Sequence, residues 1–130
     1  MGEPQQRYVV ASARTGSERI DDELVVINFD TSHYYCLNPA GTVVWTILST
    51  GPHSVEEASQ LLATAHGRDL SATVQDVSEF VAGLEAEHLV ERTDGDVSTA
   101  AVALPEAPPA YVVPRFEKFG TLEQLMIAGE

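Results

Sequence analysis

The hydrophobic period of the chain changes at Asn38-Pro39, and this change most constrains the fold. Before it, apolar residues come in short runs, as in strands; after it, they recur every three or four positions, as in helices. Asn is a favoured N-cap, and proline is tolerated at the first helical position because the N–H that it lacks would be unpaired there anyway. The sequence therefore predicts an α+β domain whose strands precede its helices.

Three segments before Asn38 are predicted to be strands. Residues 8–13 are β-prone, residues 24–29 are almost continuously apolar, and residues 33–37 are rich in aromatic side chains. A short polar turn, Asp30-Thr31-Ser32, separates the last two segments. We therefore expect these two to form a hairpin.

Three helices are predicted after Asn38. The first ends at Gly51-Pro52, and a capping box formed by Ser54 and Glu57 opens the second, which ends at Gly67. The third helix has an apolar stripe made of Val74, Val77, Val81 and Leu84. The predicted domain ends near Arg92.

Beyond Arg92 the composition changes. Residues 93–110 are rich in Ala, Pro and small polar residues and have no periodicity, which predicts a linker. Residues 111–130 regain aromatic and apolar side chains, which something must bury. The chain is therefore predicted to hold a domain over residues 1–92, a linker over 93–110 and a separate segment over 111–130.

The balance of charge argues against nucleic acid as a partner. The chain has 20 acidic and 7 basic residues, and Lys118 is its only lysine. A duplex-binding surface needs clustered cations, because phosphate contacts supply most of the affinity. The sequence has no such cluster, and its acidity suits solubility equally well.

No catalytic or metal-binding pattern is present in the sequence. The four histidines lack the spacing of metal ligands, and Cys36 is the single cysteine. Neither a glycine-rich phosphate loop nor the turn that exposes a nucleophilic serine is found. We expect no enzyme, no metal and no cofactor. Because no signal peptide or apolar run of membrane-spanning length is seen, we expect a cytoplasmic protein without membrane contact.

The order of the motifs resembles the PqqD-like domain, also known as the precursor recognition element of ribosomally synthesised and post-translationally modified peptides. The resemblance covers residues 8–92. Its motifs are Tyr34–Gly41 (YYCLNPAG), Ser54–Glu57 (SVEE), Trp45, Leu48, Gly51, Leu61, Asp76, Val77, Phe80, Val81, Leu84, Leu89 and Val90. It implies a winged-helix-like fold with a three-stranded antiparallel sheet followed by three helices. In that family the third strand is an open edge, to which a leader peptide adds as a fourth strand beside the third helix.

An open edge strand suits this role physically, because its unpaired N–H and C=O groups accept an extended peptide. Strand alternation puts His33, Tyr35 and Leu37 on one face and Tyr34 and Cys36 on the other. The predicted walls of the groove are one of these sets and three residues of the third helix: Tyr34, Tyr35, Cys36, Leu37, Val77, Val81 and Leu84. Core packing against the second helix is an equally good interpretation of the three helical residues.

Residues 111–130 resemble the leader of a lasso peptide, which typically reads Tyr-x-x-Pro-x-Leu, then a glycine and a short amphipathic stretch. The anchors that this resemblance implies are Tyr111, Pro114, Phe116, Gly120, Leu122 and Leu125. Phe116 replaces the usual leucine, and Met126 stands about where a threonine is usual. We expect residues 112–116 to add to the open edge, in their own chain or in a neighbour. A C-terminal helix that covers the core is the alternative.

These features predict a non-catalytic domain that binds the leader of a ribosomally made precursor peptide and presents it to a processing enzyme. In lasso systems that enzyme is a cysteine-type leader peptidase acting with a cyclase. Here the chain carries a leader-like segment of its own. Two alternatives stay open: a DNA-binding winged-helix regulator with an oligomerising tail, and a structural homodimer formed by tail exchange. The scarcity of Lys and Arg on the third helix disfavours the regulator.

Overall fold

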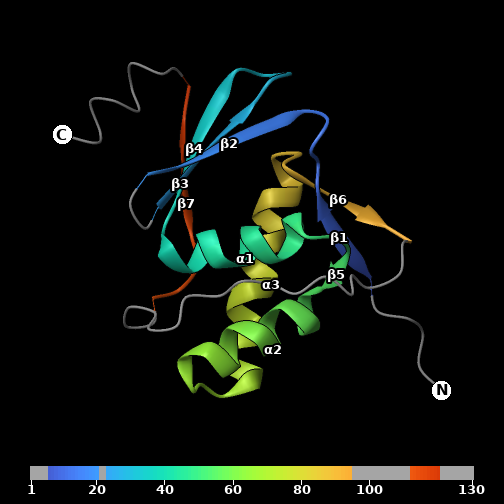
Figure 1. The fold of residues 1–130 in the computed structure, drawn as a ribbon, viewed down its shortest axis with the longest axis vertical. Helices are drawn as coiled ribbons and strands as arrows, with labels where there is room; N and C mark the ends of the chain where they lie inside the picture. The colour runs from blue at the N-terminus through green and yellow to red at the C-terminus, as the bar shows by residue number, and fades with distance from the viewer. Residues whose placement is uncertain (1–5, 21–22, 95–111, 121–130) are drawn as a thin grey trace.

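A computed structural model describes residues 6–20, 23–94 and 112–120 (Figure 1). In chain order its elements are β1 (Arg7–Val10), β2 (Thr15–Ile20), β3 (Glu23–Asn28), β4 (His33–Leu37), α1 (Pro39–Ser49), β5 (His53–Ser54), α2 (Val55–His66), α3 (Leu70–Ala86), β6 (Val90–Thr93) and β7 (Phe116–Phe119). Figure 1 shows one larger sheet and one small sheet side by side, with α2 at the end of the molecule opposite the larger sheet.

The first two helices begin at the predicted caps, and the second ends at the predicted glycine. The Asn38 side chain accepts a hydrogen bond from the backbone at the start of α1. At the start of α2, the Glu57 N–H donates to Ser54 Oγ over 3.0 Å and the Ser54 N–H donates to Glu57 Oε1 over 2.7 Å. Gly67 ends α2 in the left-handed conformation, with φ of 63°. The prediction of three helices is therefore confirmed. It was possible from sequence because each cap depends on neighbours only a few residues away.

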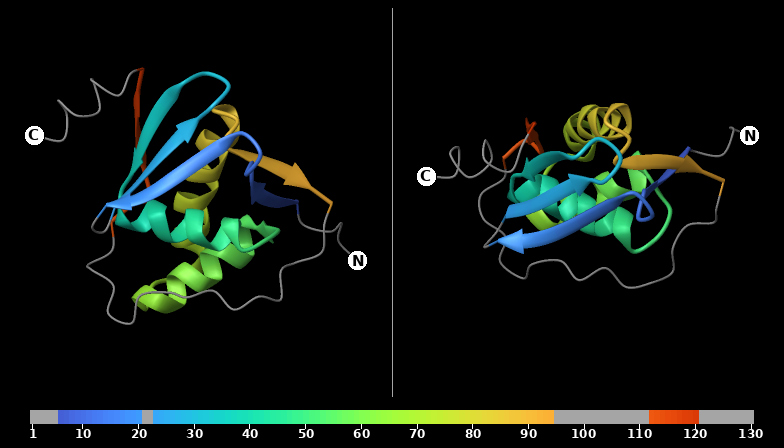
Figure 2. Two further views of the ribbon diagram at one scale, coloured as in Figure 1. Left: turned by 45° about the horizontal axis from the view of Figure 1, so that its top comes forward. Right: turned by 90° about the horizontal axis from the view of Figure 1, so that it is seen from above.

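The larger sheet is antiparallel and has the strand order β2-β3-β4-β7. The predicted hairpin of residues 24–29 and 33–37 is present as β3 and β4. β7, from the C-terminal segment, is the fourth strand, so the predicted α+β class with an added tail strand is confirmed. The added strand begins at Phe116, later than the predicted residues 112–116. Figure 2 shows β7 at the edge beside β4, toward α3.

The first predicted strand differs from the structure. Residues 8–13 do not form the first strand of the larger sheet, because the strand ends at Val10 and a turn follows, in which the Arg14 N–H donates to the Ala11 carbonyl over 3.0 Å. After this turn, β2 pairs with β3 instead. β1 belongs to the small sheet, whose order is β5-β1-β6.

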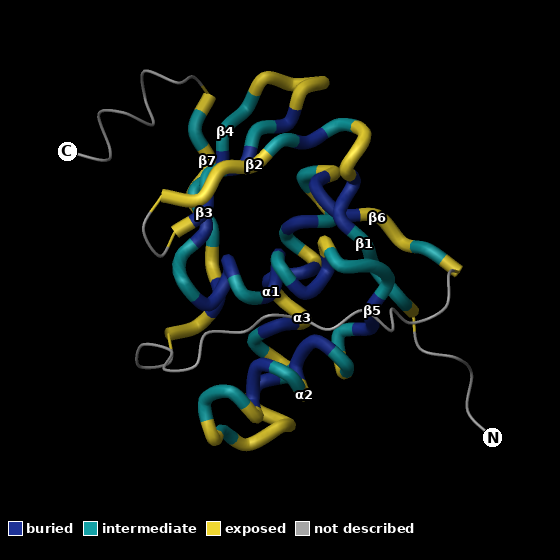
Figure 3. Tube along the Cα trace, viewed as in Figure 1, coloured by how far each residue is buried: buried dark blue, intermediate teal, exposed yellow. Residues whose placement is uncertain are grey.

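The core lies between the larger sheet and the helices, where Figure 3 shows the buried segments. Its fully buried members include Tyr35 and Leu37 of β4 and Val77, Val81 and Leu84 of α3. Phe116 of β7 is partly buried and packs against this cluster. Within the described ranges, no helix is long and apolar enough to cross a bilayer.

Candidate functional site

The edge of β4 is occupied by β7 in antiparallel register. Leu37 is opposite Phe116, Cys36 opposite Glu117, Tyr35 opposite Lys118 and Tyr34 opposite Phe119. Directly opposed residues in such a pair project to the same face. Phe116 and Lys118 therefore share the inner face with Tyr35 and Leu37, whereas Phe119 shares the outer face with Tyr34.

The predicted groove residues divide into two groups. Tyr35, Leu37, Val77, Val81 and Leu84 are all buried, with exposed fractions of 1% or less, and belong to one cluster. Tyr34 and Cys36 are only partly buried and lie on the other face of the sheet. Of the two alternatives for β4, Tyr35 and Leu37 therefore face the space between β4 and α3. The alternation of side chains along the strand directs Tyr34 and Cys36 away from it.

Phe116 enters this space as an aromatic anchor. Its ring centroid is 5.7 Å from that of Tyr35 and 6.1 Å from that of Phe80 of α3, both in edge-to-face geometry. A Cβ atom placed on Gly83 would be only 3.1 Å from Cε2 of Phe116, so the ring occupies room that a glycine leaves in α3. Sequence reasoning did not assign Phe80 and Gly83 to the site. A glycine inside a helix, near an apolar stripe, was the available signal.

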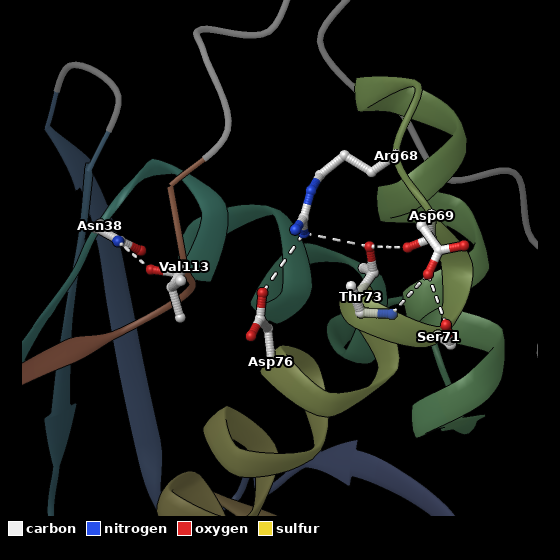
Figure 4. Close-up of polar contacts among 8 residues, drawn as sticks. Asn38, Arg68, Asp69, Ser71, Thr73, Asp76 and Val113 are labelled. Atoms are coloured by element: carbon white, nitrogen blue, oxygen red, sulfur yellow. Dashed lines mark hydrogen bonds and ion pairs between the residues drawn. The ribbon is translucent and has the colours of Figure 1, made fainter.

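Asn38 connects the C-terminal segment to the start of α1 (Figure 4). Its Nδ2 donates to the Val113 carbonyl over 2.8 Å, and its Oδ1 accepts from the Arg115 N–H over 3.1 Å. The same Oδ1 accepts from the Gly41 N–H over 2.8 Å, which caps the helix. The Asn38 N–H also donates to the Arg115 carbonyl over 3.1 Å. One residue therefore both caps α1 and binds the backbone of the incoming segment.

A small polar cluster lies at the C-terminal end of α3. The Tyr35 hydroxyl donates to Glu87 Oε1 over 2.8 Å, and Lys118 Nζ lies 2.8 Å from the same oxygen. Hydrogen bonds from Lys118 and Tyr35 hold the pKa of Glu87 below its usual value, and the charge of His33 acts in the same direction. Burial, together with the Glu87 carboxylate, raises the pKa of Tyr35 far above its usual range, so Tyr35 remains a donor.

The remaining predicted anchors are placed as follows. Pro114 is buried, and with Val113 and Arg115 it lines a cavity of about 230 Å³ against Asp76 and Phe80 of α3. Gly120 is exposed and directly follows β7. Three of the predicted anchors, Tyr111, Leu122 and Leu125, lie outside the described residues.

Two kinds of reactive group were considered at this site, a nucleophilic cysteine and a cluster of metal ligands. Burial and the carboxylates of Glu23 and Glu117 raise the pKa of the Cys36 thiol, which therefore stays protonated and weakly nucleophilic at neutral pH. Across residues 6–20, 23–94 and 112–120, no three His, Cys, Asp or Glu side chains gather as a metal site requires. What the arrangement provides is an apolar slot and polar contacts to an extended backbone.

Comparison with known proteins gives a family and a fold. The family model of coenzyme PQQ synthesis protein D (PqqD) matches residues 23–90, slightly more than half of the chain. The solved structure "TbiB1 in Complex with the TbiA(beta) Leader Peptide" is similar with a TM-score of 0.59 and 25% sequence identity, covering 64% of this chain and 94% of that chain. No curated protein matches the chain. The matched residues run from β3 to the first residue of β6 and include the whole of β4 and α3. The chain belongs to the PqqD family.

Proposed function

We propose that this protein binds the leader segment of a ribosomally made precursor peptide along the β4 edge and presents the precursor to a processing enzyme. The leader adds to the sheet as a strand, and its apolar anchor enters the slot between β4 and α3. In this chain Phe116–Phe119, part of the leader-like segment, occupy this site in the manner of a lasso leader. The domain itself, over residues 1–92, performs no catalysis and acts with a separate leader peptidase.

The observation that carries this proposal is the pairing of β7 with β4. Residues more than 75 positions apart form a strand pair through backbone groups, which any extended peptide possesses. The side-chain contacts of Phe116 add the selectivity that backbone pairing lacks. Edge addition with one buried anchor is how sheet edges generally recognise peptides.

The similarity to TbiB1 supports the same conclusion. That protein was solved with a leader peptide, and 94% of its chain aligns with this one. The similarity extends the argument from this chain's own tail to a peptide supplied by another molecule. The absence of Lys and Arg from α3 weighs against the regulator, since a helix that enters a DNA groove needs cations near phosphates.

A competition experiment with the full chain tests the proposal. The probe is a fluorescein-labelled synthetic peptide of residues 111–120. In the unaltered chain the tail competes at an effective concentration in the ~millimolar range, so the probe binds weakly. Phe116→Ala removes a partly buried ring and should weaken tail docking by about 1.5–3 kcal/mol. The probe should then bind up to about 100-fold more tightly to the variant than to the unaltered chain.

The matched control is Phe119→Ala, which deletes the same ring from the same strand on the opposite face of the sheet. Phe119→Ala should weaken docking of the tail much less, so the probe should bind this variant almost as weakly as it binds the unaltered chain. Equal probe affinity for the unaltered chain and for both variants would contradict the proposal, because the tail and the probe would then not share a site.

A further inference from the structure

Glu87 stands where a carboxylate is unfavourable for its own helix. It is the C-cap of α3, and its N–H donates to the Gly83 carbonyl over 3.2 Å. The C-terminal end of a helix carries partial negative charge and favours cations. An acidic side chain at this position therefore does not serve the stability of α3, and residues that break such local rules are commonly found at functional sites.

The Glu87 carboxylate is nevertheless held in one position. Asn28 Nδ2 donates to the Glu87 carbonyl over 3.2 Å, and His88 follows in the left-handed conformation with φ of 61°, so the backbone is fixed on both sides. The Tyr35 hydroxyl donates to Oε1 over 2.8 Å from a ring that is 1% exposed. The carboxylate is thus oriented by the domain before any peptide strand is considered.

Lys118 meets this carboxylate because of its place in the strand. It lies two residues after Phe116, and the period of two in a strand puts both side chains on the inner face. Its Nζ is 2.8 Å from Glu87 Oε1, and it is the only lysine of the chain. Any peptide that places its anchor where Phe116 lies would bring its second following residue to Glu87.

We propose that Glu87 is a specificity-determining residue of the peptide site, selecting leader segments that carry a basic residue two positions after the apolar anchor. This inference rests on the proposed function and adds the class of peptide that is preferred. A peptide with an acidic residue at that position would bring two carboxylates together and be rejected. Tyr35 is a positioning residue here, because it acts by orienting the Glu87 carboxylate.

The expected discrimination is moderate, because the pair is only partly shielded. The exposed fractions of the Lys118 and Glu87 side chains are 43% and 27%, so water and salt screen their attraction. The fixed carboxylate compensates in part, since only the lysine has to be ordered. We expect a peptide with lysine to bind about 3–10-fold more tightly than one with glutamine, and about 10–30-fold more tightly than one with glutamate.

The experiment measures peptide affinity in the full chain carrying Phe116→Ala, so that its own tail competes weakly. The probes are labelled peptides of residues 111–120 with Lys, Gln or Glu at position 118. Each is titrated against receptors with Glu87 unaltered, Glu87→Gln and Glu87→Lys. Glu91→Lys, an exposed position on β6, makes the same charge change away from the site.

The inference predicts that Glu87→Gln abolishes the ranking, Glu87→Lys reverses it in favour of the Glu probe, and Glu91→Lys leaves it unchanged. The ranking should also shrink in 1 M salt, where the Debye length is about 3 Å. If all three probes bind the receptor with Glu87 unaltered equally well, the site stands but the role of Glu87 is refuted. If no probe binds any receptor, the proposed function itself fails.

Discussion

Replacing Asn38 with aspartate should loosen β7 while leaving α1 intact. Aspartate keeps one oxygen that can accept from the Gly41 N–H and the Arg115 N–H, as Oδ1 of Asn38 does now. Aspartate and asparagine are also about equally good N-caps, and a negative charge at a helix N-terminus is favourable. The exchange therefore preserves the cap and removes a single function, the donation from Nδ2 to the Val113 carbonyl.

The magnitude follows from that one contact. A hydrogen bond of 2.8 Å is lost, which costs about 0.5–1.5 kcal/mol of docking. A carboxylate oxygen then faces the Val113 carbonyl oxygen, and the repulsion brings the total to about 1–2 kcal/mol, since Val113 is 41% exposed and water can hydrate its carbonyl. The docking equilibrium of β7 should fall by about 5–30-fold.

The assay is amide hydrogen exchange of the full chain, read over residues 112–120 and over the first turn of α1. Exchange through local opening reports the docking free energy of β7 separately from global unfolding. Urea denaturation gives the free energy of unfolding of the domain. Asp69→Asn is the matched control, because it makes the reverse exchange at the N-cap of α3, away from the tail (Figure 4).

Two results would refute the reasoning about Asn38. One is unchanged protection of residues 116–119 in the Asn38→Asp variant, which would mean that the bond to Val113 contributes nothing to docking. The other is an equal loss of protection in β7 and in α1, which would mean that the variant destabilises the whole domain. In the control, protection of β7 should stay unchanged.

Three further predictions follow from the same site. Gly83→Ala should stabilise α3 by up to about 1 kcal/mol in denaturant unfolding, yet lower β7 protection, because the new methyl group lies 3.1 Å from the Phe116 ring. Contacts with Lys118 lower the pKa of Glu87 below its ordinary value of 4.5. The part of β7 docking that depends on the Glu87 charge should therefore be complete above pH 4.5 and be lost as the pH falls through the lowered pKa. Hydrogen exchange of β7 should show this decline in the unaltered chain and not in Glu87→Gln. In gel shifts, duplex DNA should bind no better than the non-specific limit of roughly 10⁻⁴ M at physiological salt, and submicromolar binding would favour a regulator.

The helices and the central hairpin could be predicted because their signals are local. Asn38-Pro39, the Ser54 and Glu57 pair and Gly67 each act within one or two turns of backbone. The alternation of β4 likewise follows from five consecutive residues. These elements would form similar caps and faces in many tertiary contexts, so sequence alone suffices for them.

The missed elements depend on distant partners. β2 reads TGSERI, and its last four residues are exposed, so no apolar pattern distinguishes it from a loop. β5 and β6 have two and four residues and exist because β1 pairs with both. Asn38 and Glu87 were invisible as site residues for the same reason, since their partners in the tail lie 75 and 31 positions away along the chain, at Val113 and Lys118.

Apart from β7, the larger sheet ends at β2 on one side and at β4 on the other, and these two strands differ in charge. β2, at one edge, carries Glu18 and Arg19 and is mostly exposed, and charges of this kind discourage the addition of further strands. β4 reads HYYCL, has no Asp, Glu, Lys or Arg, and is covered by β7. Because it has none of these four residue types, β4 does not discourage pairing as β2 does, which suits it to accept a strand.

A leader peptide supplied by another molecule would have to displace the strand that already covers β4. At a concentration of about 1 μM it competes with a tail whose effective concentration is about 1 mM, so it must bind about 1,000-fold more tightly, or about 4 kcal/mol. Backbone pairing and the contacts from Asn38 are the same for any extended peptide and cannot supply this difference. Under the proposed function it must come from side chains, and the slot that holds Phe116 and the Glu87 carboxylate are two points that can supply it.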